Sequence, residues 1–296
     1  MSKAHAETIP AGSFLIFLHI QKTAGITVQR MLRRHYGPGV FKRLGARLGG
    51  SQAQGGTMRD ALAATTPANR YFAGHMCYGV HRYLPQPSTY LAFFREPVSR
   101  LVSLYHYSKT NETAYYHSYA KNASAEEFLL ETDLMELDNG QVRFVAGDEA
   151  DMFINRTPVG GCGEDLLEQA KRNIENDFGF VGIMERFDES AVLLGKRLGW
   201  HSSFYLRRNT GRKGTTSAVS DEVKRRVREK NRLDVAFYSF LCERFDQDAA
   251  AYGSGFAEDV ADFRRKNLLY SRVLLPPYEL YDAFKARLSG NPNRPR

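Results

Sequence analysis

The chain has 296 residues, 43% of them hydrophobic and 25% charged, which is the balance of an ordinary globular protein. This composition excludes a disordered, collagen-like or coiled-coil chain. The 41 Lys and Arg residues outnumber the 33 Asp and Glu residues, and the net charge of +8 favours an anionic partner such as a nucleic acid, a membrane surface, a nucleotide or an acidic sugar.

Strand-like and helix-like segments alternate along the chain. In order, the sequence predicts a strand at 14–20, a helix at 26–36, a short helix near 57–64, strands at 70–74 and 89–94, helices that begin at 97 and 124, a helix around 166–174, a strand at 178–184, and helices at 188–198, 220–232 and 234–250. The predicted strands are short apolar runs, which are typical of a buried parallel sheet. The alternation predicts an α/β fold with a mainly parallel central sheet flanked by helices.

Local signals set the starts of several helices. Pro97 occupies a first helical position, where its missing N–H costs nothing. Ser124 and Glu127 have the spacing of a capping box. Asp188 and Ser220 are expected to be the N-caps of two later helices.

The sequence contains no internal repeat and no linker rich in Pro or Ser, so it predicts one main domain. We expect an N-terminal tail at 1–13, the domain at 14–250, and a C-terminal helical extension with a polar tail at 251–296. Three sparse cysteines favour a reducing compartment. Without an apolar leader or a run of ~20 apolar residues, we expect a cytoplasmic protein that has no transmembrane segment.

The turn between the first strand and the first helix, QKTAGIT at 21–27, has the residues of an anion site. The N–H groups and the dipole of a helix N-terminus attract an anion. Gly25 allows the backbone to approach a bound group, Lys22 supplies a charge, and Thr23 and Thr27 supply hydroxyls. The Walker A pattern is absent because the lysine precedes the glycine. For this string alone, a solvated lysine in an ordinary turn is an equal alternative.

A second polar signal follows the strand at 89–94. Arg95 stands at its carboxyl end, where open parallel sheets bind ligands. Ser103 lies about two helical turns further on, so its hydroxyl can face the same edge. A guanidinium with a hydroxyl suits a phosphate. Taken alone, an ion pair between Arg95 and Glu96 is the better interpretation, but the two signals together favour a ligand with two separated phosphates.

The same residues carry a family resemblance. HIQKTAG at 19–25 with Thr27, and FFREPVSRLVSLYHY at 93–107, resemble the two cofactor motifs of the sulfotransferases that use 3′-phosphoadenosine 5′-phosphosulfate (PAPS). The resemblance is to the carbohydrate type, which includes the heparan sulfate 2-O-sulfotransferases and bacterial relatives. Further segments, among them AGHMCYGVHRYL and DNGQVRFVAG, follow in the expected order over most of 14–250. It implies a P-loop-kinase-like sulfotransferase fold and sulfuryl transfer from PAPS to an acceptor hydroxyl on a carbohydrate, without a metal.

The resemblance also implies which residues bind the donor. The 5′-phosphosulfate would be held by Lys22, Thr23, Ala24, Gly25, Ile26 and Thr27. The 3′-phosphate would be held by Arg95 and Ser103, and a basic segment would add Arg208 and Asn209. The sequence departs from the usual HIPKTAGTS at Gln21 and Ile26, so we expect a lower affinity for the 5′ end.

Charge and family pattern indicate two catalytic candidates. In-line transfer moves negative charge onto the bridging oxygen of the leaving phosphate, and a cation that tightens there stabilises the transition state, which makes Lys22 the candidate. His75 matches the GH segment of the family, and an imidazole with an ordinary pKa of about 6.5 suits a general base. A hydrogen-bonded structural histidine is the alternative. His81, His106 and Glu96 are weaker candidates.

The acceptor contacts are harder to read from the sequence. Arg143 is a candidate for an anionic acceptor, although a buried polar role beside a helix is at least as good an interpretation. Tyr116, with Tyr115 and His117, belongs to an aromatic loop at 107–123 that is expected to be irregular and to stack on sugar rings.

The sequence thus predicts a PAPS-dependent sulfotransferase that acts on a glycan or another hydroxyl compound, with no nucleic-acid partner. Two alternatives stay open. A P-loop-type nucleotide kinase fits the strand–loop–helix unit, and a non-catalytic polyanion-binding protein fits the net charge of +8.

Overall fold

The structure is a computed structural model. It describes residues 9–10, 12–37, 43–44, 62–63, 65–66, 70–149, 153–206 and 219–288, with side chains up to residue 274 apart from those of 43–44. The short helix expected near 57–64 lies outside these residues except at 62–63, and so does the tail from 289 onward.

A five-stranded sheet forms the centre of the molecule, in the order β2-β3-β1-β4-β5. The strands are β1 (Phe14–Leu18), β2 (Arg43–Leu44), β3 (Tyr71–Gly74), β4 (Ser88–Phe94) and β5 (Phe178–Ile183). All four neighbouring pairs are parallel, which confirms the predicted fold class. The strand β2 was not expected. The other four begin within one residue and end within two of the predicted bounds.

The register brings several strand ends to one edge. Leu18 of β1 pairs with Gly74 of β3 and with Ala92 of β4. Phe94 of β4 pairs with Ile183 of β5. The segments that leave β1, β3, β4 and β5 at their carboxyl ends therefore start side by side, as expected for a ligand-binding edge of an open parallel sheet.

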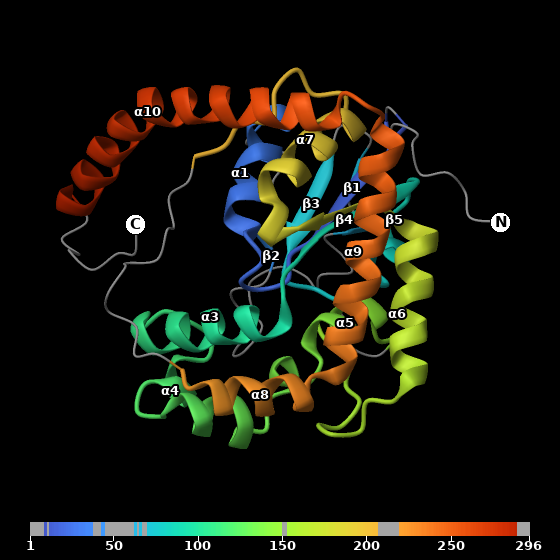
Figure 1. The fold of residues 1–296 in the computed structure, drawn as a ribbon, viewed down its shortest axis with the longest axis vertical. Helices are drawn as coiled ribbons and strands as arrows, with labels where there is room; N and C mark the ends of the chain where they lie inside the picture. Colours follow the sequence, from blue (N-terminus) through green and yellow to red (C-terminus); the bar gives the residue numbers. More distant parts are fainter. Residues whose placement is uncertain are drawn as a thin grey trace.

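Most helices fall close to their predicted bounds. The helices are α1 (Gly25–Tyr36), α3 (Pro97–Thr110), α4 (His117–Ala120), α5 (Gly140–Ala146), α6 (Glu164–Asp177), α7 (Phe187–Arg197), α8 (Asp221–Lys230), α9 (Arg232–Tyr252) and α10 (Phe256–Leu288). Of these, α4 and α5 were not expected, and the helix predicted from 124 is short, with a π-helical turn at Glu127–Glu131. Short 3-10 or π-helical turns occur at Val80–Tyr83, Glu127–Glu131, Met135–Leu137 and Met184–Arg186. In Figure 1, α1 lies on the left of the strands and α6 on their right.

Two predicted caps are confirmed and one is wrong. Ser124 N–H donates to Glu127 Oε2 at 2.7 Å, and Glu127 N–H donates to Ser124 Oγ at 3.2 Å. Ser220 Oγ accepts the Val223 N–H at 3.3 Å at the start of α8. Asp188 is not an N-cap, because α7 already begins at Phe187, and its carboxylate accepts the Tyr205 hydroxyl instead.

The loop predicted at 107–123 is shorter than expected. The helix α3 continues to Thr110 and α4 occupies His117–Ala120, so the irregular part is confined to 111–116 and 121–124. The extra turns are possible because Tyr105 and Ala120 pack into a buried cluster that stabilises both helices.

The apolar residues form two clusters. The larger contains the strands and their covering helices, with Ile16, Phe93 and Phe237 fully buried. The smaller lies between α3, α4, α8 and the turn at Glu127–Glu131, and it includes Leu101, Phe128 and Val227. These helices form the lower tier of Figure 1. The smaller cluster fixes the position of α3, the helix that follows β4 and Arg95.

The helix α10 packs against the main body through its first turns. Phe263 belongs to the larger cluster, and Asn267 accepts the backbone N–H of Tyr205 at 2.8 Å through its side-chain oxygen. Arg264 pairs with Asp188 at 3.3 Å on α7. Within the described part of the chain, no helix is both long enough and apolar enough to cross a membrane.

Candidate functional site

The turn between β1 and α1, called the donor loop here (residues 19–25), has an unusual backbone. Lys22 and Ala24 both have φ of 67°, in the left-handed region that residues with a Cβ rarely adopt. Ala24 is the N-cap of α1 and provides no side-chain acceptor for the first-turn N–H groups. Those N–H groups point out of a helix N-terminus, which is the geometry that binds anions.

The side chains of the donor loop and of the first turn of α1 only partly match the expected anion contacts. Thr23 is fully buried and its hydroxyl donates to the Ile20 carbonyl at 2.9 Å, so it closes the loop rather than offering a hydroxyl to a ligand. Thr27 is half-buried in the first turn of α1. Ile26, which stands where the family motif has a hydroxyl, is 46% exposed.

Gly25 is required for a reason that the sequence did not reveal. A Cβ at this position would lie 1.7 Å from His19 Nε2. The imidazole of His19 occupies that space, and the Gln29 amide lies 3.1 Å from its Nδ1. The ring of His19 therefore excludes a Cβ at position 25. The expected reason, the close approach of a bound group, is not needed to explain the glycine.

Lys22 and Arg95 lie together. Arg95 Nη1 donates to the Lys22 carbonyl at 3.2 Å. The Lys22 ammonium lies 4.0 Å from the centroid of the Tyr107 ring, a cation–π geometry. Burial and the nearby Arg95 charge lower the pKa of Lys22 to about 8. Among the described residues, no carboxylate lies within ion-pair distance of Lys22, so an anion would relieve the repulsion between the two cations.

Arg95 is held by its backbone. Its N–H donates to Gln141 Oε1 at 3.1 Å, and its carbonyl accepts Gln141 Nε2 at 2.9 Å. Its side-chain Nε is buried without a hydrogen-bond partner, at 3.8 Å from Glu185 Oε1. This orphaned donor, beside a cation that lacks a carboxylate, fits an anionic group such as a phosphate.

The alternative interpretation, an ion pair between Arg95 and Glu96, is wrong. Glu96 is the N-cap of α3, and its carboxylate accepts the N–H groups of Val98 at 3.2 Å and Ser99 at 2.7 Å. The carboxylate beside Arg95 is instead Glu185, at the end of β5. An N-cap carboxylate interacts favourably with the dipole of its own helix, which explains its orientation.

Ser103 lies on the same side of α3 as the Lys22 contact. Tyr107, four residues further on, carries the Lys22 ammonium over its ring, and residues i and i+4 of a helix share a face. Ser103 is half-buried on that face. The structure therefore brings Lys22 and Arg95 together at one edge of the sheet, and Ser103 shares the α3 face of the Lys22 contact.

His75 follows β3 and faces the donor loop. Its Nδ1 lies 2.7 Å from the His19 carbonyl, and its ring stacks on the His19 ring at 4.3 Å between centroids. A carbonyl only accepts, so Nδ1 carries the proton of neutral His75 and the lone pair is on Nε2. A histidine fixed in this tautomer has the form that a general base needs.

The weaker candidate His81 has a structural environment. Its Nδ1 lies 2.9 Å from the Tyr90 hydroxyl, which also accepts the N–H groups of Gly79 and His81. Tyr90 pairs with Ile16 in the middle of β1, so this contact lies away from the carboxyl edge of the sheet. Burial also lowers the pKa of His81.

Arg143 is not an acceptor contact. Its side chain is fully buried, and its five N–H groups all have partners within the protein. Those partners are the carbonyl and Oδ2 of Asp138 and the carbonyls of Asn155, Thr157 and Pro158. No donor remains for a bound sugar, so the alternative of a buried structural group is the correct one.

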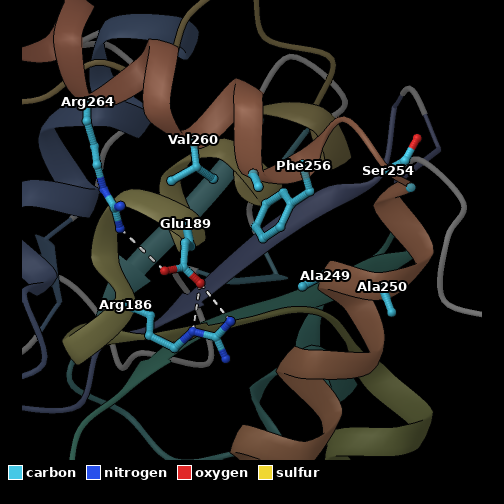
Figure 2. A pocket seen from close by; sticks show the side chains of 10 residues that line it. Arg186, Glu189, Ala249, Ala250, Ser254, Phe256, Val260 and Arg264 are labelled. Atoms are coloured by element: carbon cyan, nitrogen blue, oxygen red, sulfur yellow. Dashed lines mark hydrogen bonds and ion pairs between the residues drawn. The ribbon is translucent and has the colours of Figure 1, made fainter.

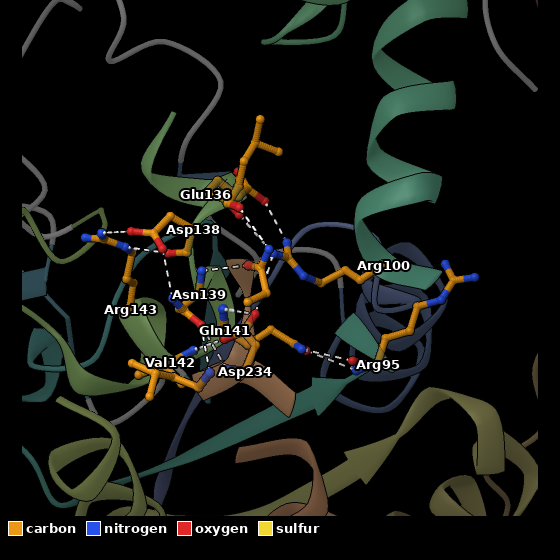
Figure 3. A network of polar contacts seen from close by, with 12 residues as sticks. Arg95, Arg100, Glu136, Asp138, Asn139, Gln141, Val142, Arg143 and Asp234 are labelled. Atoms are coloured by element: carbon orange, nitrogen blue, oxygen red, sulfur yellow. Dashed lines mark hydrogen bonds and ion pairs between the residues drawn. The ribbon is translucent and has the colours of Figure 1, made fainter. Parts of the chain in front are cut away.

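A buried polar network connects the starts of α5 and α9 to the backbone of Arg95 (Figure 3). Asp234 accepts the N–H groups of Gln141 at 3.1 Å and Val142 at 2.8 Å at the start of α5. Asn139 Oδ1 accepts the N–H groups of Leu233 and Asp234 at the start of α9. The two helices therefore cap each other, and Gln141 extends from this network to the backbone of Arg95.

Glu136 links the donor loop to the aromatic segment. The Tyr116 hydroxyl donates to its Oε2 at 2.8 Å, and Gln21 Nε2 donates to the same oxygen at 3.2 Å. Arg100 Nη1 donates to its Oε1 at 3.2 Å. Sequence reasoning missed Glu136 and Arg100, although a lone arginine on the apolar face of α3 was a usable signal. The hydroxyl proton of Tyr116 is therefore engaged within the protein.

Arg208 and Asn209 fall outside the described residues. A cavity of about 500 Å³ opens between α7, α9 and α10, but its Arg186 and Arg264 both pair with Glu189 (Figure 2). In the described ranges, no group of three or more His, Cys, Asp or Glu residues has the arrangement of a metal site.

Comparison with known proteins gives one consistent result. The family model described as galactose-3-O-sulfotransferase matches residues 2–276. Galactose-3-O-sulfotransferase 3 of Homo sapiens is 26% identical over 275 residues, covering 84% of this chain and 60% of that protein. Galactose-3-O-sulfotransferase 2 of Homo sapiens is 26% identical over 250 residues, covering 77% and 59%. Galactosylceramide sulfotransferase of Bos taurus is 32% identical over 123 residues, covering 40% and 28%. The chain spans about 60% of the length of the first of these relatives.

Proposed function

Because the chain belongs to the galactose-3-O-sulfotransferase family, we propose that it transfers a sulfuryl group from PAPS to a hydroxyl of a carbohydrate acceptor. This family agrees with the carbohydrate type of sulfotransferase that the sequence resembles. Its name specifies galactose, whereas the resemblance was illustrated by the heparan sulfate 2-O-sulfotransferases. The names of the relatives support a galactose-containing glycan or glycolipid as the acceptor.

The observation that carries the proposal is the contact between Lys22 and Arg95, two cations that share a sheet edge and lack a counter-charge on the Lys22 side. A donor with a phosphate at each end would supply that charge. Lys22 and the first-turn N–H groups of α1 would hold the 5′-phosphosulfate. Arg95 and Ser103 would hold the 3′-phosphate. The orphaned Nε of Arg95 supports this assignment.

The reaction follows from these positions. PAPS supplies the sulfuryl group, whose bond to the 5′-phosphate oxygen breaks as the acceptor oxygen bonds to sulfur. His75 accepts the acceptor hydroxyl proton at Nε2, because its Nδ1–H is held by the His19 carbonyl. The Lys22 ammonium stabilises the negative charge that grows on the oxygen of the leaving phosphate. Arg208 and Asn209 remain predicted donor contacts.

Calorimetry and a transfer assay test the proposal together. We expect 3′-phosphoadenosine 5′-phosphate to bind more tightly than AMP, because only the former can reach both cations, and we expect mass-detected sulfate transfer from PAPS to a β-galactoside. Lys22→Ala should abolish transfer, whereas the exposed Lys121→Ala serves as the matched control. Equal binding of the two nucleotides, with no transfer, would refute the proposal. Magnesium-dependent ATP turnover would revive the kinase alternative.

A further inference from the structure

Two exposed hydrophobic side chains border the donor loop, and a third is attached to it through its neighbour. Among the described residues, seven large hydrophobic side chains are exposed, and three of them lie on α10. The other four are Ile26, Tyr107, Tyr115 and Tyr119, on α1, α3, the 111–116 loop and α4. Tyr115 is the most exposed of the seven, at 71%. Ile26 directly follows the donor loop, and the Tyr107 ring lies 4.0 Å from the Lys22 ammonium. Tyr115 connects to the loop through Tyr116. Exposed side chains grouped in this way beside a site mark a ligand-binding surface more often than scattered residues do.

Tyr116 fixes the position of Tyr115. The two rings meet edge to face, with centroids 4.9 Å apart. The hydroxyl of Tyr116 donates to Glu136 Oε2 at 2.8 Å, the oxygen that also accepts Gln21 Nε2 at 3.2 Å. Glu136 is buried, and burial raises the pKa of Tyr116, so the hydroxyl keeps its proton. The Tyr116 ring and the Glu136 carboxylate therefore connect Tyr115 to Gln21, the residue before Lys22.

A second contact attaches the next residue. His117 Nδ1 lies 2.9 Å from the Ser108 carbonyl on α3. The residue before Ser108 is Tyr107, whose ring lies 4.0 Å from the Lys22 ammonium. The residues after Tyr115 are thus attached both to the donor loop and to the backbone of α3. Tyr115 itself projects into solvent from this fixed base.

We propose that the ring of Tyr115 is the platform on which an uncharged sugar of the acceptor stacks during sulfation. This inference rests on the proposed function. The apolar body of a tyrosine packs well against a partner that also has polar groups at its edge. A β-galactoside has such a surface, since one face of its ring carries the hydrogens of C3, C4 and C5 while its hydroxyls lie around the rim. Tyr115, rather than the Tyr116 named from the sequence, is the side chain available for it.

Two basic side chains that could attract an acidic chain are already engaged within the protein, which favours an uncharged sugar. Lys109, in the last turn of α3, donates to the Tyr105 hydroxyl and to the Ala123 carbonyl, both at 2.8 Å. Its ammonium is therefore held at the smaller apolar cluster. Arg143, the expected contact for an anionic acceptor, has no free donor.

The experiment compares three variants with the unmodified chain. Tyr115→Ala removes the platform, Tyr115→Phe keeps the ring, and Tyr119→Ala removes another exposed tyrosine, 52% exposed on α4, as the matched control. We expect Tyr115→Ala to raise the KM for a β-galactoside about tenfold, the size of a lost aromatic stacking contact. Its KM for PAPS and its affinity for 3′-phosphoadenosine 5′-phosphate should stay within twofold, because no donor contact is lost. The other two variants should stay within twofold in every constant.

A second readout does not depend on turnover. Saturation-transfer NMR with methyl β-galactoside should show contacts at H3, H4 and H5 with the unmodified chain and lose them with Tyr115→Ala. If the unmodified chain transfers sulfate while Tyr115→Ala keeps its acceptor KM, the platform is overturned and the proposed function stands. If the unmodified chain transfers no sulfate but the NMR contacts are present and vanish in Tyr115→Ala, the proposed function fails and the sugar platform stands. An equal effect of Tyr119→Ala, or a change of oligomeric state on gel filtration of Tyr115→Ala, would also overturn the platform.

Discussion

Arg95 Nη1 donates a hydrogen bond to the backbone carbonyl of Lys22 at 3.2 Å. The residues that the sequence assigned to opposite ends of one ligand are therefore in direct contact. This hydrogen bond joins the segment that follows β4 to the segment that follows β1. Had the two cations lain on unconnected surfaces, the idea of a doubly phosphorylated ligand would have had no structural basis.

The first prediction concerns the guanidinium of Arg95. Arg95→Lys keeps a positive charge but loses the planar fork that pairs with phosphate oxygens. A hydrogen bond to a charged group contributes about 1.5–3 kcal/mol, so the affinity for 3′-phosphoadenosine 5′-phosphate should fall about 10-fold to 150-fold in calorimetry. AMP, which lacks the 3′-phosphate, is the control ligand and should bind equally to both proteins. An equal loss for AMP would show that Arg95 acts on the fold of the donor loop instead.

The second prediction concerns pH and Lys22. Burial and Arg95 disfavour its ammonium and lower its pKa to about 8, whereas a bound dianion favours the ammonium. Affinity for 3′-phosphoadenosine 5′-phosphate should thus be constant below pH 7 and weaken as the pH rises through 8, by at most about tenfold per pH unit. Calorimetry at pH 6.5, 7.5, 8.5 and 9.5 measures this. Lys22→Arg should flatten the profile, since arginine stays protonated.

The third prediction concerns His75. His75→Asn keeps a side-chain N–H for the His19 carbonyl but removes the basic nitrogen. Loss of a general base should lower kcat by about 10²-fold to 10⁴-fold while 3′-phosphoadenosine 5′-phosphate still binds normally. His106→Asn, on α3, is the control and should leave kcat within twofold. An active His75→Asn variant would remove His75 from the reaction.

The fourth prediction separates stability from acceptor binding at Arg143. Arg143→Met leaves the Asp138 carboxylate buried without its partner, which costs about 3–5 kcal/mol of unfolding free energy. Tm should fall by roughly 6–20 °C, measured by calorimetry. At low temperature the folded variant should keep the acceptor KM of the parent. A raised KM with an unchanged Tm would restore the acceptor role that the geometry rejects.

The strands and the donor loop were predictable because their signals are local. A continuous apolar run such as 14–18 indicates a strand that is buried on both faces of the sheet. The carboxyl ends of parallel strands lie at the same edge of the sheet, whatever the conformation of the loops. The strand β2 was missed because two residues, Arg43–Leu44, carry no periodicity. Asp188 was mistaken for a cap because the pattern alone does not show where a first turn starts.

The contacts that hold the site were not predictable, since they join residues far apart in the chain. Gln141 donates a hydrogen bond to the backbone carbonyl of Arg95, 46 positions earlier, and no pattern in either segment predicts this contact. The role of Gly25 depends on the ring of His19, six residues earlier but on the opposite side of a turn. Arg143 was considered as an acceptor contact because the sequence gives the charge of a residue but not its burial.

The exchange of caps between Asn139 and Asp234 has a consequence for how the protein opens. The first amides of α5 are held by a carboxylate 93 positions later, and the first amides of α9 are held by an amide oxygen of the segment that precedes α5. Neither helix start can loosen alone, so the amide hydrogens of Gln141 and Leu233 should exchange with solvent at matching rates. Because Gln141 also restrains Arg95, a nucleotide that occupies the sheet edge should slow both exchanges together.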